Sequence, residues 1–166
     1  MLQSLKNKIK DQRGLTLIEL LAVIVILGII AAIAIPSIMG LIDNSKKDAH
    51  VSNAIQMVNS VKTAVSADKS LIPADESNPV YLSLDYLLQK GYIEDFKDPD
   101  TDGNYVKGTY TESGNDKTVL TVKPTDVSYV KIEKVDKTLV YSVQLIGNER
   151  KILEIPSTDL ERSKVE

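Results

Sequence analysis

Residues 20–42 contain no charged side chain, and most of these positions are leucine, isoleucine, valine or alanine. A helix of 23 such residues is long enough to cross a hydrocarbon core of about 30 Å. Glu19 stands immediately before this stretch, in a position where an ionisable group is rare and usually has a function. The sequence therefore predicts an apolar helix that has to be surrounded by lipid or by other helices.

The net charge changes sign along the chain. Residues 1–14 carry +3 and the whole chain carries −3, so the part after residue 14 carries −6. A basic segment before an apolar span keeps the N-terminus in the cytoplasm and directs the rest outward. An acidic outer part does not suit nucleic acid, and the lack of cysteine excludes disulfides and thiolate metal sites.

A cleaved signal peptide is the competing interpretation of the apolar span. Such peptides have an apolar region of about 7–15 residues followed by a small-residue cleavage site. The span here is longer, and its one competing cleavage region is AAIAIPS, around Ala32. Cleavage there would leave a helix that begins at Pro36.

The helical pattern continues beyond the apolar span. Six apolar residues recur at offsets 0, 3, 4, 7, 10 and 14, which places them on one face of a helix: Val51, Ala54, Ile55, Val58, Val61 and Val65. We therefore predict one helix from about Leu15 to Ala67, roughly 80 Å long at 1.5 Å per residue. Its second half is expected to lie on a globular domain by this face.

The rest of the chain predicts a small antiparallel sheet. Residues 70–81 are expected to form a loop and residues 82–93 a short helix, with Ser83 as its cap and Gly91 just past its end. Four later runs alternate β-branched and polar residues and predict a meander: VLTVK, VSYVKIE, LVYSVQLI and KILEI. The polar tail, residues 158–166, is expected to fray. The predicted fold class is α+β, a long N-terminal helix packed on a small antiparallel sheet.

The segment RGLTLIELLAVIVILGIIAAIAIP, residues 13–36, resembles the N-terminus of a type IV prepilin, in the superfamily of type IV pilins and pseudopilins. The resemblance rests on the short basic leader, the Gly14–Leu15 junction, Thr16, Glu19 and the apolar run. Leu15 stands where the family usually has phenylalanine. The resemblance implies a leader peptide at 1–14, a transmembrane and filament-core helix at 15–42, and an extracytoplasmic globular domain at 43–166.

The resemblance also implies partners and processing. A prepilin peptidase would cut after Gly14 and methylate the new amine of Leu15, and an assembly platform with its ATPase would polymerise the subunit into a homo-oligomeric helical filament. A buried carboxylate is costly unless it is paired. We therefore expect Glu19 to pair with the Leu15 amine of a neighbouring subunit, against the alternative of a carboxylate that only reaches the membrane surface near a helix N-terminus.

Gly28 and Pro36 interrupt an otherwise strong helix pattern, because glycine adds backbone freedom and proline removes one helical hydrogen bond. In the family this segment loses helicity when it packs into the fibre, so both positions are expected to weaken the helix. The alternative is that glycine and proline are simply more common in membrane helices.

The loop DPDTDGN places Asp98, Asp100 and Asp102 at alternate positions before a glycine, which is the first half of a calcium-binding loop. The twelfth position is Thr109 in place of a bidentate glutamate, so the second half of the pattern fails. Major pseudopilins carry calcium near a comparable loop. Calcium is therefore the one cofactor suggested, with a solvated, Asp-rich turn as the alternative.

His50 is the only histidine, and it is expected to be exposed and inert. The chain contains no Gly-rich phosphate loop, no His-Glu-x-x-His, no nucleophile elbow and no Cys–His arrangement, so no enzyme is expected. Its seven tyrosines are scattered and do not predict a stacking platform for nucleic acid.

Three functions follow from these features. The first is a structural subunit, a major pilin or pilin-like protein, which is a single-pass membrane protein before assembly and part of a surface filament afterwards. The second is a pseudopilin of a type II secretion or competence DNA-uptake machine. The third is a membrane-anchored domain that does not polymerise.

Overall fold

The computed structural model describes residues 16–101, 103–111 and 121–166. The chain divides into two compact units, Met1–Asp43 and Asn44–Glu166. Among the described residues, every apolar side chain of the buried core belongs to the second unit. The first unit contributes an exposed stretch of helix.

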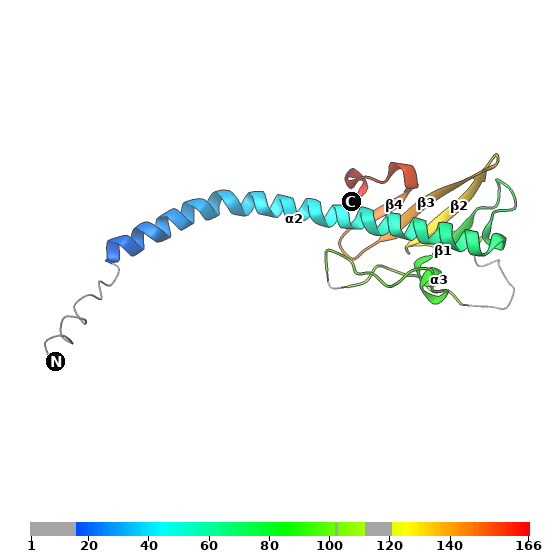
Figure 1. Cartoon of the computed structure of the whole chain (residues 1–166), viewed down its shortest axis with the longest axis horizontal. Helices are drawn as coiled ribbons and strands as arrows, with labels where there is room; N and C mark the ends of the chain where they lie inside the picture. The colour runs from blue at the N-terminus through cyan, green and yellow to red at the C-terminus, as the bar shows by residue number, and fades with distance from the viewer. Residues whose placement is uncertain (1–15, 102, 112–120) are drawn as a thin grey trace, which may run out of the picture. The chain divides into compact units, whose positions relative to one another are not determined.

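Helix α2 runs without a break over Leu17–Ala67 (Figure 1). The predicted long helix is therefore confirmed over the described residues, while Leu15 lies outside them. Pro36 lies inside the helix. Its ring removes one backbone hydrogen bond, but the remaining hydrogen bonds of this 51-residue helix keep it continuous.

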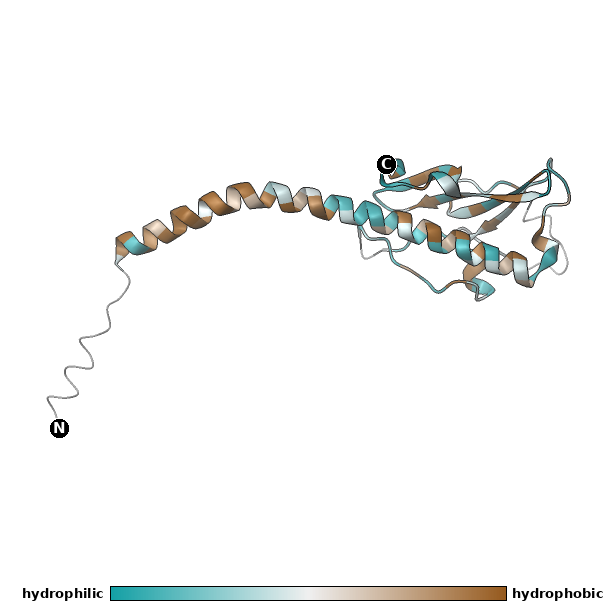
Figure 2. Ribbon diagram, turned by 45° about the horizontal axis from the view of Figure 1, so that its top comes forward, coloured by the Kyte–Doolittle hydropathy of each residue, from teal (hydrophilic) through white to brown (hydrophobic). Residues whose placement is uncertain are grey.

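The two halves of α2 differ in the residues they present. Figure 2 shows hydrophobic residues all round the first half and a mixture of hydrophobic and polar residues in the second half. The buried residues all lie in the second half: His50, Ala54, Met57, Val58, Val61, Ala64 and Val65. This half is thus amphipathic and covers a core, as its spacing predicts.

The prediction of a buried face on α2 is wrong for one residue, Ile55. Ile55 is 44% exposed, although its neighbour Ala54 is fully buried. The buried residues centre on positions 54, 57, 61 and 64, and each residue is turned about 100° from the previous one, so Ile55 points to the outer side. Val51 is half-buried at the edge of the core.

The second unit contains a four-stranded antiparallel sheet in the order β1-β2-β3-β4. The strands are β1 (Val80–Ser83), β2 (Tyr129–Val135), β3 (Thr138–Ile146) and β4 (Lys151–Pro156). The last three confirm the predicted meander. Across the two pairings that β2 makes, Val130 faces Leu82 of β1 and Val143 of β3, which places apolar side chains in one row.

The first strand is not where the sequence predicts it. Val80–Ser83 was expected to divide between a loop and a helix, but it pairs with β2 through contacts such as Val80 with Ile132. The described part of VLTVK, residues 121–123, is not a strand. Four residues are too short for an alternation to stand out, and pairing across some fifty positions is decided by tertiary contacts.

The sheet and α2 share one hydrophobic core. The strands contribute side chains that are fully buried, and these pack with the buried face of α2: Leu82, Val130, Ile132, Val143, Leu145 and Ile152. The alternation along each strand puts these residues on the face toward the helix. Figure 1 shows the second half of α2 lying along the sheet.

Helix α3 covers Leu84–Gln89 and follows β1 directly. The Ser83 hydroxyl accepts a hydrogen bond from the Tyr86 N–H at 3.1 Å, which confirms the predicted cap. Gly91 follows the last turn at φ +72°, a conformation that favours glycine. A short 3-10 turn, η1 (Lys69–Leu71), joins α2 to the loop before β1.

The expectation that the tail frays is wrong. Residues after β4 form the turns η3 (Ser157–Asp159) and η4 (Arg162–Lys164), and Val165 is only 4% exposed. Val165 bridges to Ile152, and Arg162 donates two hydrogen bonds to the carboxylate of Asp48 on α2. The buried Val165, the ion pair with Asp48 and two backbone hydrogen bonds between Lys151 and Glu166 therefore hold a segment that is mostly polar.

Candidate functional site

Glu19 closes a capping box at the N-terminus of α2. Its Oε2 accepts hydrogen bonds from the backbone N–H and the hydroxyl of Thr16, both at 2.7 Å. In return the Glu19 N–H donates to Thr16 Oγ1 at 3.3 Å. This is the reciprocal pattern of Ser or Thr followed by Glu three residues later, and it was readable in the sequence as T-L-I-E. The carboxylate thus has a local role that the assembly interpretation did not include.

The processing residues lie outside this geometry. Gly14 and Leu15 are outside the described residues, so cleavage, methylation and the pairing of Glu19 with a Leu15 amine all stay predictions. The side chain of Glu19 is exposed in the single chain. It is therefore accessible to a partner from another molecule.

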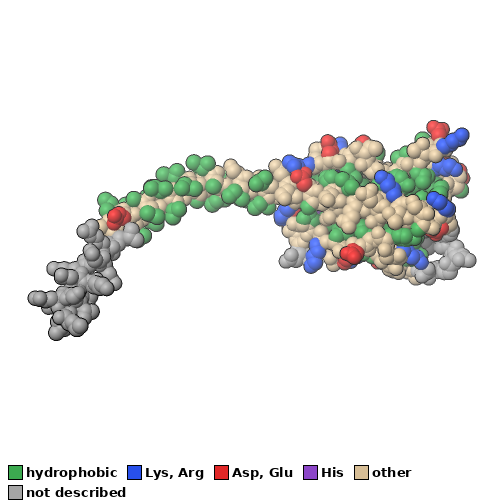
Figure 3. All heavy atoms as spheres, in the orientation of Figure 1, with side chains coloured by type: hydrophobic (Ala, Val, Ile, Leu, Met, Phe, Trp, Pro, Cys, Tyr) green, Lys and Arg blue, Asp and Glu red, His purple; other side chains and the backbone are tan. Residues whose placement is uncertain are grey.

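The first half of α2 is covered with exposed apolar side chains. Large apolar residues from Leu17 to Ile42 are between 47% and 84% exposed. Figure 3 shows them as green atoms all along this part of the helix. Within the described part of the chain, α2 is the one helix long and apolar enough to cross a membrane. So large an apolar surface marks contact with lipid or with other proteins.

Gly28 and Pro36 lie within this surface, in unbroken helix. A side chain at Gly28 would meet no atom within 4 Å, so packing inside the single chain does not require glycine there. Their role in weakening the helix stays a prediction.

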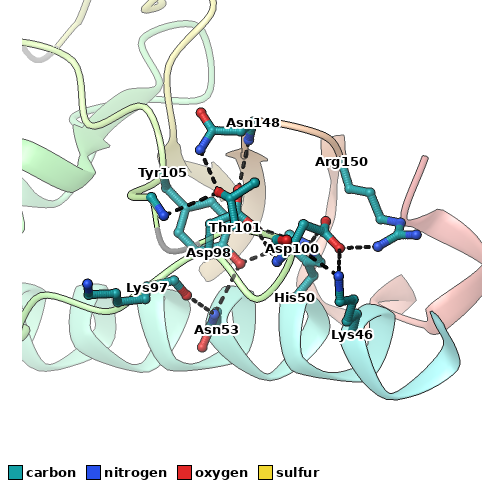
Figure 4. A network of polar contacts seen from close by, with 11 residues as sticks. Lys46, His50, Asn53, Lys97, Asp98, Asp100, Thr101, Tyr105, Asn148 and Arg150 are labelled. Atoms are coloured by element: carbon teal, nitrogen blue, oxygen red, sulfur yellow. Dashed lines mark hydrogen bonds and ion pairs between the residues drawn. The ribbon is translucent and has the colours of Figure 1, made fainter. Parts of the chain in front are cut away.

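A second cluster of polar groups lies in the second unit and joins three segments (Figure 4). Lys46, His50 and Asn53 lie one turn apart on the same side of α2. The 97–104 loop contributes Asp98 and Asp100, and the turn between β3 and β4 contributes Asn148 and Arg150. The loop is closed by a bridge between Lys97 and Asn104.

Both carboxylates of this cluster are paired. Asp100 contacts His50 Nε2 at 2.8 Å, Lys46 Nζ at 3.6 Å, and the guanidinium of Arg150. Asp98 accepts hydrogen bonds from the backbone N–H groups of Asp100 at 2.9 Å and Asn148 at 2.7 Å. Burial raises the pKa of Asp100, but the His50 hydrogen bond and the charge of Arg150 outweigh it, so the pKa lies below its ordinary value.

His50 is buried, which corrects the prediction of an exposed and inert residue. It is 1% exposed, and its Nδ1 lies 2.8 Å from the hydroxyl of Tyr105, which in turn accepts from Asn53 at 3.1 Å. Burial raises the pKa of Tyr105 above its ordinary value, so its hydroxyl keeps its proton. An ionised carboxylate can only accept, so Nε2–H donates to Asp100, and the Tyr105 hydroxyl is the partner of Nδ1. No local sequence signal distinguishes this histidine, because both partners come from distant positions.

Comparison with known proteins bears on the N-terminal motif and on the globular part. Residues 9–35 match the model of the prokaryotic N-terminal methylation motif. The type II secretion system core protein G of Klebsiella michiganensis is 31% identical over 104 residues, which cover 58% of this chain and 72% of that protein. The chain belongs to the superfamily of type IV pilins and pseudopilins.

Other relatives in the superfamily match over shorter lengths. The type II secretion system core protein G of Aeromonas hydrophila is 31% identical over 98 residues, 59% of this chain and 64% of that protein. The fimbrial protein EcpC of Eikenella corrodens is 42% identical over 69 residues, 40% of this chain and 42% of that protein. The chain thus spans less than two thirds of these two relatives. No solved structure matches the chain.

Membership settles the kind of protein and its fold. The chain is a pilin-like structural subunit, with the long helix and antiparallel sheet of the α+β class. The superfamily is one of structural subunits and not of enzymes, and the apolar helix with its prepilin motif indicates membrane anchoring.

The two described carboxylates of the loop do not fit a calcium ion. Calcium takes six to eight oxygen ligands. Both oxygens of Asp98 already accept backbone N–H groups, and Asp100 is held by His50, Lys46 and Arg150. A Cβ on Gly147 would lie 2.7 Å from Asp98 Oδ2, so the neighbouring turn leaves no space on that side. Asp102 lies outside the described residues, and its part in the calcium prediction stays a prediction.

Proposed function

We propose that this subunit is cut between Gly14 and Leu15 and then polymerises through residues 15–42 into a type IV-related filament. The observation that carries the proposal is the exposed, uncharged and mostly apolar helix surface from Leu20 to Ile42, which begins next to an accessible carboxylate at Glu19. A surface of this size has to be buried in lipid first and against other helices afterwards. The globular part, residues 43–166, would form the outside of the filament.

The charges of the chain support a defined orientation. The net +3 of residues 1–14 favours a cytoplasmic leader, and the acidic remainder favours export. Prepilin peptidase would act on the leader from within the membrane, and the assembly platform and ATPase would then move the mature subunit out of the bilayer. The proposed partners are therefore these proteins, the cytoplasmic membrane and further copies of the chain.

Cleavage would supply a partner for Glu19. The new amine of Leu15 is positively charged, and a neighbouring subunit's amine would pair with the carboxylate as apolar helices close around both. Loss of one partner from a buried ion pair costs about 3–5 kcal/mol. The pair would therefore fix the axial position of each incoming subunit.

The substitution Glu19→Gln tests the pairing. Glutamine at this position of a capping box still bonds back to residue 16, so the local cap survives while the charge is lost. Thr16→Ala is the matched control, because it removes the hydroxyl from the cap and leaves the carboxylate. Electron microscopy and shear fractionation would measure filaments, and the mass of the membrane-bound subunit would measure processing.

We expect Glu19→Gln to give processed, membrane-retained subunit with few or no filaments, and Thr16→Ala to give filaments near the normal amount. Abundant filaments from Glu19→Gln would refute the pairing. Equal losses in the two variants would assign the effect to the cap and not to the charge.

A pseudopilin of a secretion machine is the second candidate. The match to core protein G of Klebsiella michiganensis, over 72% of that protein, favours it because it extends well beyond the N-terminal motif. A deletion strain separates the two candidates. Loss of exported proteins in a strain whose parent shows no surface filaments would favour the pseudopilin, and loss of visible filaments with normal export would favour the pilin.

A further inference from the structure

The polar cluster of the second unit brings together groups from distant parts of the sequence. Asp100 belongs to the 97–104 loop, Lys46 to α2 and Arg150 to the turn between β3 and β4. The side chain of Asp100 is fully buried, whereas those of Lys46 and Arg150 are 34% and 20% exposed. The buried carboxylate of Asp100 is therefore paired with two partly exposed cationic side chains.

Among the described residues, two carboxylates and two cationic side chains meet in the cluster. Asp98 and Asp100 supply two negative charges, and Lys46 and Arg150 supply two positive ones. His50 contacts Asp100 through Nε2 and the Tyr105 hydroxyl through Nδ1. The described residues leave no buried side-chain nitrogen or oxygen without a hydrogen-bond partner. A divalent ion at these carboxylates would add a charge of +2 beside Lys46 and Arg150, which already pair with Asp100.

Three side chains of the cluster could hold a transition metal, but each already has hydrogen-bond partners within the protein. His50, Asp98 and Asp100 place one ligand atom each within 4.8 Å of one another, which is a nitrogen and oxygen set that suits zinc. The Nε2 atom, however, is 2.8 Å from Asp100 Oδ2, a distance that a shared proton explains. A metal would have to displace both this proton and Arg150.

We propose that protein cations, with Arg150 foremost, take the place of a divalent metal ion in the 97–104 loop, so that the second unit folds and keeps its stability without calcium. Arg150 acts as a fixed counter-ion that pins the loop between α2 and the β3–β4 turn. Lys46 adds a second charge at longer range, and His50 contacts the same carboxylate through Nε2.

Metal dependence is the first test, and it uses the full chain in non-ionic detergent. All seven tyrosines lie between Tyr81 and Tyr141, so tyrosine fluorescence reports on the second unit alone. Thermal melts are recorded with 1 mM EDTA, with 1 mM calcium and with zinc at roughly 0.1 mM. We expect the three midpoints to agree within about 1 °C, because an ion that does not bind the native state does not stabilise it. A calcium-dependent or zinc-dependent rise of roughly 5 °C or more would overturn the proposal.

Substitution of Arg150 is the second test, and it separates charge from packing. Arg150→Gln leaves Asp100 short of its main counter-ion and is expected to lower the midpoint by roughly 5–10 °C, whereas Arg150→Lys keeps the charge and most of the stability. Arg162→Gln is the matched control at an exposed ion pair with Asp48, with an expected loss of about 1–2 °C. Equal losses for Arg150→Lys and Arg150→Gln would refute the counter-ion role. If Arg150→Gln does not fold, the stability of Arg150→Lys and the melts with added metal ions still test whether Arg150 takes the place of a metal.

Discussion

Val58→Ala tests the packing of α2 on the sheet, because Val58 is 2% exposed and belongs to the core that α2 shares with the strands. The substitution removes two methyl groups, at about 0.8 kcal/mol each for the transfer from water. The space left behind adds a cavity term, so we expect a loss of about 2–3 kcal/mol. For a unit of this size, that lowers the melting midpoint by roughly 8–12 °C.

Ile55→Ala is the control, because it removes a larger side chain than Val58→Ala from the exposed side of the same helix. It removes more carbon than Val58→Ala, but Ile55 is 44% exposed and alanine favours the helix, so the net loss should stay below about 1 kcal/mol. Both variants are measured in the full chain in detergent, with tyrosine fluorescence as the probe. If Ile55→Ala lost as much stability as Val58→Ala, or if Val58→Ala melted like the wild type, the assignment of the buried face would be refuted.

Two further predictions concern processing and acid stability. N-terminal mass spectrometry of assembled material should begin at a methylated Leu15, and a start at Met1 or after Ala34 would contradict cleavage at Gly14. Burial raises the pKa of Glu154, but hydrogen bonds from Lys123 and Tyr129 and the charge of Lys131 outweigh it and hold the pKa below its ordinary value. The ionised carboxylate therefore contributes stability above the pKa of the unfolded chain, about 4.3, and that stability is lost as the pH falls through the lower folded value. Urea titrations should give the wild type a higher free energy of unfolding than Glu154→Gln at pH 7, and this difference should shrink below about pH 4. A difference that grows in acid would show that the ionised carboxylate does not stabilise the fold.

The features that depend on local pattern could be predicted from the sequence. The long helix, the three strands from Tyr129 onward and the cap at Ser83 all follow from spacing and residue type, because their hydrogen bonds join residues near one another in the chain. The N-terminal motif is equally local, since Gly14, Leu15 and Glu19 stand within six positions. The capping box of Thr16 and Glu19 is local as well, because its two residues are three positions apart.

Tertiary structure decided the features that join distant segments. The strand Val80–Ser83 exists because β2 offers it an edge, and the tail is ordered because Val165 finds a buried place beside Ile152. His50 is buried because Tyr105 and Asp100, some fifty positions away, satisfy both of its ring nitrogens. A polar residue is stable in a core only when such partners arrive, and their arrival depends on how the whole chain folds. The local sequence therefore predicts a calcium-binding loop, whereas the tertiary structure places Arg150 beside the carboxylate of Asp100.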